Sequence, residues 1–213
     1  LVRIPGMPIN VTRPETQFPI RLAELQIPEQ GHRYMVPMLP FKLDPSFDTA
    51  LIQILQKDPE AQLILVKHHG LEQVIRARLL AKIPEHDHRR LHCIPKIPRE
   101  LFPSALAQMD VILNTFPFGG GNTALQALSS GSPLVCMQSR FLRGRFCQGY
   151  YQHMGVNGLV VDTVDAYSDL AVRLATDLEF QAQKRAEILE KSAGLFDQTE
   201  GSDALCQWIL GKA

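Results

Sequence analysis

Residues 109–133 read MDVILNTFPFGGGNTALQALSSGSP, and this stretch indicates how the chain folds. The apolar run Val111–Leu113 is typical of a buried parallel strand. Three glycines follow at 119–121, and a helix is predicted to open on Asn122 and Thr123. Glycine permits positive φ and close approach of backbone N–H groups to a ligand, and a helix N-terminus favours anions. The stretch therefore predicts a phosphate site, with a tight structural turn as the alternative.

The rest of the chain alternates between strand-like and helix-like segments. Strands are predicted at 32–38, 62–66, 91–94, 111–113, 134–137 and 159–161. Helices are predicted at 45–57, 71–82, 103–108, after 122, at 144–154, 164–178, 179–191 and 202–210, the last one anchored by Trp208. This alternation predicts an α/β fold, a Rossmann-like parallel sheet with helices on both faces.

Ligands in such sheets bind beyond the carboxyl ends of the strands. The loops after Leu113 and Ile94, and the segment around Lys42, are therefore expected to converge on one crevice. Residues 1–30 contain five prolines and no clear period, which predicts an extended connector, and residues 31–213 are predicted to form one Rossmann-like domain.

Composition narrows the possible partners. Lys+Arg and Asp+Glu balance at 22 each, so no charge excess indicates nucleic acid or an anionic membrane. No apolar run reaches the ~20 residues that span a bilayer, and the N-terminus lacks the order of a signal peptide. Cys93, Cys136, Cys147 and Cys206 are scattered without a C-x-x-C pair. These features predict a cytoplasmic protein with reduced thiols.

The opening stretch resembles the donor-binding half of the SPINDLY and O-GlcNAc transferase family and its bacterial relatives. Members carry Asp-Thr-Phe-Pro after a strand, a small-residue loop with a Thr pair, a helix with an acidic residue, and Gly-x-Pro-x-Val. The corresponding elements here are, in the same order and without a gap, Asn114–Pro117, Gly119–Thr123, Gln126–Leu128 and Gly131–Val135.

The resemblance extends over nearly all 213 residues. Val2–Gly6 resembles the Leu-Pro-Gly segment that joins the two domains of family members, and Phe41–Pro45 resembles a segment whose lysine reaches the donor pyrophosphate. The resemblance thus implies the C-terminal domain of a two-domain, GT-B-type glycosyltransferase. Phe102 and Ala105 stand where O-GlcNAc transferases place a histidine and an arginine, which makes the bacterial relatives the closer match.

What the resemblance implies about function is specific. The expected activity is inverting, metal-independent transfer from a UDP-sugar, such as UDP-GlcNAc or UDP-glucose, to a protein or peptide side chain. No cofactor is implied, because Lys42 and a helix N-terminus can stabilise the departing diphosphate. The family's candidate base and acceptor groove come largely from the missing N-terminal domain, so this chain alone is expected to be inactive.

The resemblance assigns a catalytic role to Lys42. It assigns donor binding to Ile97, Arg99, Gly119, Gly120, Gly121, Asn122, Thr123 and Gln126. The residues alone favour a solvated loop lysine at position 42. They also favour a capping box, in which Thr123 caps the helix and Gln126 returns to the cap.

Gln126 departs from the family, because most members carry an acid there that accepts hydrogen bonds from the ribose. A neutral amide is expected to weaken each such bond by about 1 kcal/mol. This departure keeps a catalytically decayed nucleotide-sugar-binding module open as one alternative, and an unrelated phosphate-binding protein is another. Arg143 and Arg145 form a basic turn, which is either solvated or in contact with phosphate or acceptor. No histidine set has zinc spacing, so no metal is expected.

Overall fold

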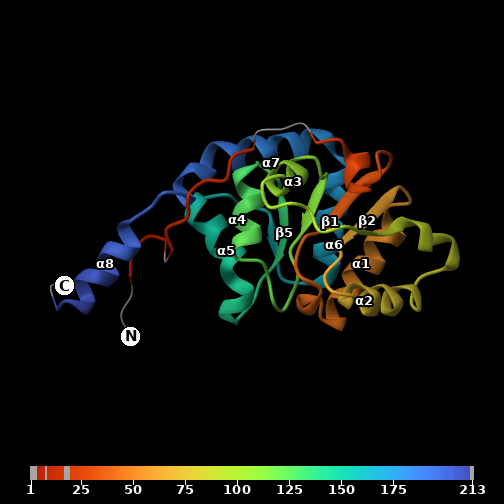
Figure 1. Cartoon of the computed structure of the whole chain (residues 1–213), viewed down its shortest axis with the longest axis horizontal. Coiled ribbons are helices and arrows are strands. Elements are labelled where there is room, and N and C mark those ends of the chain that lie inside the picture. The colour runs from red at the N-terminus through yellow and green to blue at the C-terminus, as the bar shows by residue number, and fades with distance from the viewer. Residues whose placement is uncertain (1–3, 8, 17–19, 212–213) are drawn as a thin grey trace.

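The computed structural model describes residues 4–7, 9–16 and 20–211, so Val2 and Arg3 of the predicted connector lie outside the described residues. Six parallel strands form one sheet in the order β3-β2-β1-β4-β5-β6 (Figure 1). Their bounds are β1 His32–Val36, β2 Ala61–Val66, β3 Leu91–Ile94, β4 Val111–Leu113, β5 Leu134–Met137 and β6 Val160–Val161. Every predicted strand is present, and the α/β prediction is confirmed.

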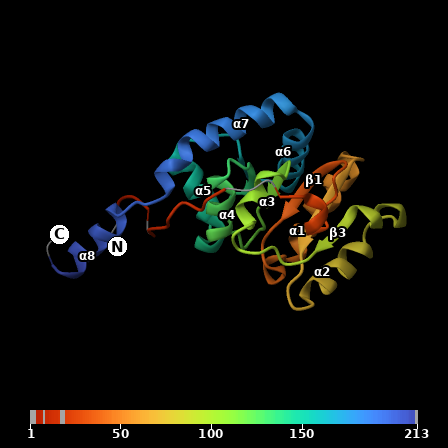
Figure 2. The same cartoon turned by 45° about the horizontal axis from the view of Figure 1, so that its top comes forward.

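Helices cover both faces of this sheet, as predicted. The α-helices are α1 Pro45–Lys57, α2 Leu71–Leu80, α3 Phe102–Ala107, α4 Asn122–Ser129, α5 Leu142–Met154, α6 Val164–Thr176, α7 Leu178–Lys191 and α8 Glu200–Ile209. Short 3-10 helices are η1 Leu22–Leu25, η2 Pro40–Lys42, η3 Glu85–Arg90 and η4 Ser192–Leu195. Helices α1 and α6 pack together on one face, and α3, α4 and α5 cover the other (Figures 1 and 2).

The strand order reverses between β1 and β4, where Tyr34 pairs with Val111 and Met35 with Ile112. The chain leaves these two strands toward opposite faces, which leaves a crevice at their carboxyl ends. An edge-to-face cluster of rings, Phe47, Phe116 and Tyr167, fills the core beside this point, with Phe47 and Phe116 centroids 5.0 Å apart. The core next to the crevice is therefore closely packed with aromatic rings.

The described part of residues 4–30 contains η1 and no strand. Arg13 donates to the carbonyl of Ser129 at the end of α4 (3.0 Å), and its guanidinium lies 5.7 Å from the Phe196 ring centroid. Met7 and Ile27 are buried against the core. The segment is thus packed on the domain, and its role as a connector between domains stays a prediction.

The predicted anchoring of the last helix by Trp208 is wrong. Trp208 is 51% exposed, and α8 projects away from the sheet (Figure 1). The only buried residue of α8 is Gly201, where a Cβ would overlap the Met7 backbone. The helix is therefore attached by its first turn, and its apolar C-terminal side chains remain at the surface.

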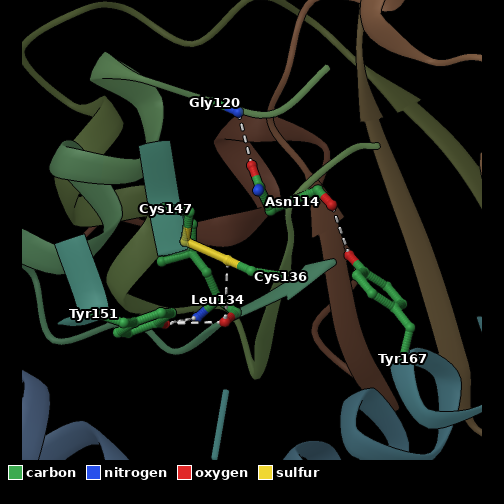
Figure 3. Close-up of a disulfide and its surroundings, with 7 residues drawn as sticks. All are labelled: Asn114, Gly120, Leu134, Cys136, Cys147, Tyr151 and Tyr167. Atoms are coloured by element: carbon green, nitrogen blue, oxygen red, sulfur yellow. Dashed lines mark hydrogen bonds between the residues drawn. A yellow bond between two sulfur atoms is a disulfide. The ribbon is translucent and has the colours of Figure 1, made fainter. Parts of the chain in front are cut away.

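The prediction of reduced thiols is also wrong for two of the four cysteines. Cys136 on β5 and Cys147 on α5 form a disulfide, while Cys93 and Cys206 are free (Figure 3). Helix α5 folds back along β5, and the Tyr151 hydroxyl bonds to both backbone groups of Leu134 (2.9 Å each). This packing brings together two cysteines that are 11 positions apart, which spacing alone does not predict.

Candidate functional site

The glycine loop after β4 is held by hydrogen bonds within the protein. The buried Asn114 side chain accepts through Oδ1 from the N–H of Gly120 (2.7 Å), and its carbonyl accepts from the Tyr167 hydroxyl (3.0 Å) (Figure 3). The N–H of Gly119 donates to the carbonyl of Arg143 (3.0 Å). Two backbone donors of the glycine loop are therefore already used within the protein, and the donor-binding roles of Gly119 and Gly120 stay predictions.

The first two glycines differ from the third by close neighbours rather than by positive φ. None of the three has φ in the left-handed region. A Cβ on Gly119 would lie 2.9 Å from Asn114 Nδ2, and one on Gly120 would lie 2.7 Å from Met38 Cε. A Cβ on Gly121 would meet nothing within 4 Å. Gly121 is thus the one of these three glycines at which a side chain would have open space.

The N-terminus of α4 supplies the free donors of the site. The helix begins at Asn122 with Gly121 as its N-cap and has no side-chain cap hydrogen bond. Within the described chain, no group accepts from the N–H groups of Asn122, Thr123 or Ala124. These donors and the positive end of the helix dipole attract an anion.

The alternative prediction of a capping box at Thr123 and Gln126 is wrong. Because the cap position falls on Gly121, Thr123 lies inside the first turn and Gln126 is one turn further on. Both side chains are half-buried. Helix capping therefore does not occupy them, and both remain available at the surface of the site.

Lys42 lies against the glycine loop. Its Nζ donates to the carbonyl of Gly119 (3.1 Å) and stands 4.3 Å from the centroid of the Phe118 ring. Burial lowers the pKa of this ammonium group. The alternative of a solvated loop lysine is wrong, because η2 turns the chain after β1 toward the loop after β4. The predicted convergence of these two segments is confirmed.

A hollow of about 520 Å³ opens beside the N-terminus of α4. It is lined by Pro37, Leu39, Val66, Lys96, Ile97, Pro98, Arg99, Phe102, Thr123 and Gln126. The loop after β3 therefore reaches the same crevice, as predicted, and brings Ile97 and Arg99 to Thr123 and Gln126. Asn122, which precedes Thr123 in the chain, is exposed and is not part of this lining. A second hollow, of about 460 Å³, adjoins it through Arg99 and Gln126 and is bordered by residues 12–15.

The sequence did not identify two residues, Asn114 and Phe118, that shape the candidate site. Asn114 shapes the loop, and its position at the family's Asp-Thr-Phe-Pro motif was the available signal. The ring of Phe118 makes a cation–π contact with the Lys42 ammonium group, and no pattern in the sequence predicts that contact. Both depend on how the loop folds back on β1.

Two kinds of feature are absent from the part of the chain that the structure describes. No three His, Cys, Asp or Glu side chains there come together in a way that could hold a metal ion. No helix in this part combines the length and apolar character needed to cross a membrane.

A family model and two curated relatives match this chain, and all three are glycosyltransferases. The model of glycosyl transferase family 41 matches residues 22–203. The UDP-N-acetylglucosamine–peptide N-acetylglucosaminyltransferase of Caenorhabditis elegans is 28% identical over 191 residues, which is 82% of this chain and 15% of that protein. The UDP-glucose:protein N-beta-glucosyltransferase of Actinobacillus pleuropneumoniae is 27% identical over 128 residues, 60% of this chain and 19% of that protein. The chain thus spans less than a fifth of these relatives.

Solved structures share the fold. An O-GlcNAc transferase mutant from Thermobaculum terrenum superimposes with a TM-score of 0.73 at 20% identity, over 98% of this chain and 38% of that one. Anabaena HepE, solved with UDP and glucose, gives 0.62 at 14% identity, over 85% of this chain and 49% of that one. At these identities the similarity concerns the fold, which is the Rossmann-like half of a GT-B glycosyltransferase.

Proposed function

The chain belongs to glycosyl transferase family 41, and from this premise we propose that it is the donor-binding, C-terminal half of a protein glycosyltransferase. The donor is a UDP-sugar, either UDP-GlcNAc or UDP-glucose, because the relatives from C. elegans and A. pleuropneumoniae are named for these two donors. Those names also state that a peptide or a protein is the acceptor. The relatives are much longer, so the complete activity requires a second, N-terminal domain.

The donor is proposed to lie along the crevice at the strand reversal. The hollow lined by Ile97, Arg99 and Phe102 has room for the uracil base. Gln126, which lines the same hollow, is proposed to accept from the ribose. The diphosphate then reaches the free N–H groups of Asn122 and Thr123, where the helix dipole favours negative charge. The base, the ribose and the diphosphate of the donor would thus lie, in this order, at the hollow, at Gln126 and at the N-terminus of α4 beside Lys42.

Lys42 is the residue we assign to leaving-group stabilisation. As the bond between the anomeric carbon and the diphosphate oxygen breaks, negative charge develops on the departing UDP. A preorganised ammonium group and helix N-terminus stabilise that charge more in the transition state than in the ground state. The acceptor side chain attacks from the opposite face, which inverts the anomeric carbon, and its proton passes to a base of the N-terminal domain. The proposal requires no metal or other cofactor.

The observation that carries this proposal is the Lys42–Gly119 hydrogen bond beside the uncapped N-terminus of α4. Titration calorimetry of UDP and GDP with the intact protein tests it, and UDP is expected to bind more tightly. Gly121→Val should abolish binding without unfolding the protein, since a side chain there projects into open space. Gly149→Val, which also projects into open space but on α5, is the matched control. Unchanged UDP affinity in a folded Gly121→Val variant contradicts the proposal.

A second candidate rests on Gln126, where the family carries an acid. If the domain is a decayed nucleotide-sugar-binding module, the intact protein binds UDP but transfers no sugar to any peptide. Single-turnover assays with radiolabelled donor separate the two candidates.

A cytoplasmic location also belongs to the proposal. A cytoplasmic location requires reduced Cys136 and Cys147, because disulfides are rare in the cytosol, so an oxidised pair in acid-quenched cells would contradict this location.

A further inference from the structure

Three arginines gather where the turn after β5 leads into the first residues of α5. We use the name arginine turn for Arg140, Phe141, Leu142, Arg143 and Arg145, all of which are exposed. Arg33, Arg78 and Arg90 are paired with carboxylates elsewhere in the domain. Among the residues that the structure describes, no carboxylate pairs with any of the three arginines of the turn. The arginine turn is thus a local positive surface on a chain of zero net charge.

The ring of Phe141 contacts two of these arginines, Arg140 and Arg143. The guanidinium carbons of Arg140 and Arg143 lie 4.7 and 4.6 Å from the centroid of the Phe141 ring. Cation–π attraction favours these positions despite the like charges. Phe141 is 41% exposed and Leu142 is 74% exposed beside them. Arginine and aromatic side chains of this kind are enriched at the energetic centres of protein interfaces.

The backbone fixes the arginine turn next to the proposed donor site. The carbonyl of Arg143 accepts from the N–H of Gly119 (3.0 Å). Gly144 packs so closely that a Cβ there would lie 2.7 Å from the carbonyl oxygen of Pro117. A partner held by these arginines therefore lies at the same edge of the sheet as the glycine loop.

Next to the turn, a hollow of about 390 Å³ lies between α5 and residues 6–7. It is lined by Gly6, Met7, Leu142, Arg145, Phe146, Gln148, Gly149, Tyr150, Gln152 and His153. This lining includes no carboxylate, and Arg145 and Leu142 belong both to the hollow and to the turn. Amide, aromatic and aliphatic groups next to arginines suit a peptide better than a bare phosphate.

We propose that the arginine turn binds an acidic segment of the acceptor protein and holds it beside the donor. This inference rests on the proposed function and adds the chemistry of the acceptor to it. Guanidinium groups match carboxylates with two parallel hydrogen bonds, and the exposed Phe141 and Leu142 give apolar contact to the same segment. The donor diphosphate has its own partners at Lys42 and α4, so it does not require these arginines.

The test uses the intact protein and two fluorescein-labelled peptides. One carries a serine between runs of glutamate, and the other has glutamine in place of every glutamate. In fluorescence anisotropy at low salt, the glutamate peptide is expected to bind at least about tenfold more tightly, and added salt should reduce the difference. The double variant Arg140→Gln/Arg143→Gln should reduce the preference to within about twofold. Arg145→Gln is a milder second variant, and Arg89→Gln, exposed at the amino end of β3, is the control.

UDP titration of the same proteins distinguishes the possible failures. The inference is supported if the double variant loses the preference for glutamate and keeps wild-type UDP affinity. It is overturned if the two peptides bind equally to wild type, or if the double variant loses UDP affinity and keeps the peptide preference, which would assign the arginines to the diphosphate. A wild-type protein that binds no UDP overturns the proposed function, whatever the peptides do.

Discussion

At the scale of single residues, Lys42 places a partly buried ammonium group beside the glycine loop. Replacing it by alanine in the intact enzyme should reduce kcat by roughly a hundredfold, as removal of one preorganised donor does, with a smaller effect on donor affinity. The pKa of Lys42 is lowered by burial, so its charge is lost at a lower pH than that of a free lysine. The alkaline limb of the kcat/KM profile should therefore lie below the ordinary lysine range and be absent in Lys42→Ala. Turnover within a fewfold of wild type would remove Lys42 from the mechanism.

Gln126 allows a test in the opposite direction, toward gain of binding. Gln126→Glu should tighten UDP binding by about 1 kcal/mol, because a charged acceptor bonds the ribose more strongly than an amide. Since Gln126 is the fifth residue of α4 and caps nothing, thermal stability should change by less than about 0.5 kcal/mol. Calorimetry and thermal unfolding measure the two quantities separately. A more stable protein with unchanged UDP affinity would place the ribose elsewhere.

Asn114 determines the shape of the glycine loop. Asn114→Leu keeps the size of the side chain but leaves the N–H of Gly120 without its partner in a buried position. An unsatisfied buried donor costs about 1–3 kcal/mol, and the loop should also lose UDP affinity. Urea unfolding measures the first effect, with the exposed Asn157→Leu as the control. Equal stability of the two variants would show that the loop does not depend on this bond.

At the scale of elements, the disulfide joins β5 to α5 (Figure 3). The paired replacement Cys136→Ala/Cys147→Ala should lower the free energy of unfolding by about 3 kcal/mol relative to the oxidised protein, from the loop that the bond closes. With excess dithiothreitol the two proteins should become similarly stable. Thiol titration of the oxidised protein after unfolding should detect only Cys93 and Cys206. Four reactive thiols without reductant would contradict the bond.

Elements were predictable from sequence wherever local pattern decides them. The apolar strands 111–113 and 134–137 and the helix at 45–57 are formed as their periodicity indicates. The start of α4 at Asn122 was predicted, but the capping-box motif put the cap on Thr123, whereas the loop geometry puts it on Gly121. The exposure of Trp208 was missed because the sequence does not show which helices lack a neighbouring surface. The disulfide depends on the packing of α5 along β5.

The candidate site was predictable to a similar extent. Order along the sheet places Lys42, Ile97 and Gly121 near one edge, and that followed from the alternation of strands and helices. The bond from Gly120 to Asn114, and the stacking of Lys42 on Phe118, required the path of each loop in space. The roles assigned to these residues in donor binding stay predictions.

At the scale of the whole molecule, the crevice lies between the two halves of the sheet, β3-β2-β1 and β4-β5-β6. A nucleotide there contacts both halves, so it should stabilise the domain as one unit. UDP at a hundred times its Kd should add about 2.7 kcal/mol to the free energy of unfolding. Thermal shift across a UDP series measures this, and uridine alone should give a smaller shift. Two separate unfolding transitions, of which UDP moves one, would contradict the prediction.

The hydrogen bonds of the glycine loop also affect the thermodynamics of ligand entry. Because Asn114 and Arg143 already hold Gly120 and Gly119, the conformational entropy of these residues is lost during folding rather than at each encounter with a nucleotide. In the proposed function, association of the donor therefore needs little rearrangement of this segment, and departure of the spent nucleotide does not have to wait for the loop to open. Among the steps of a catalytic cycle, product release should then depend on the strength of the contacts rather than on a slow local motion.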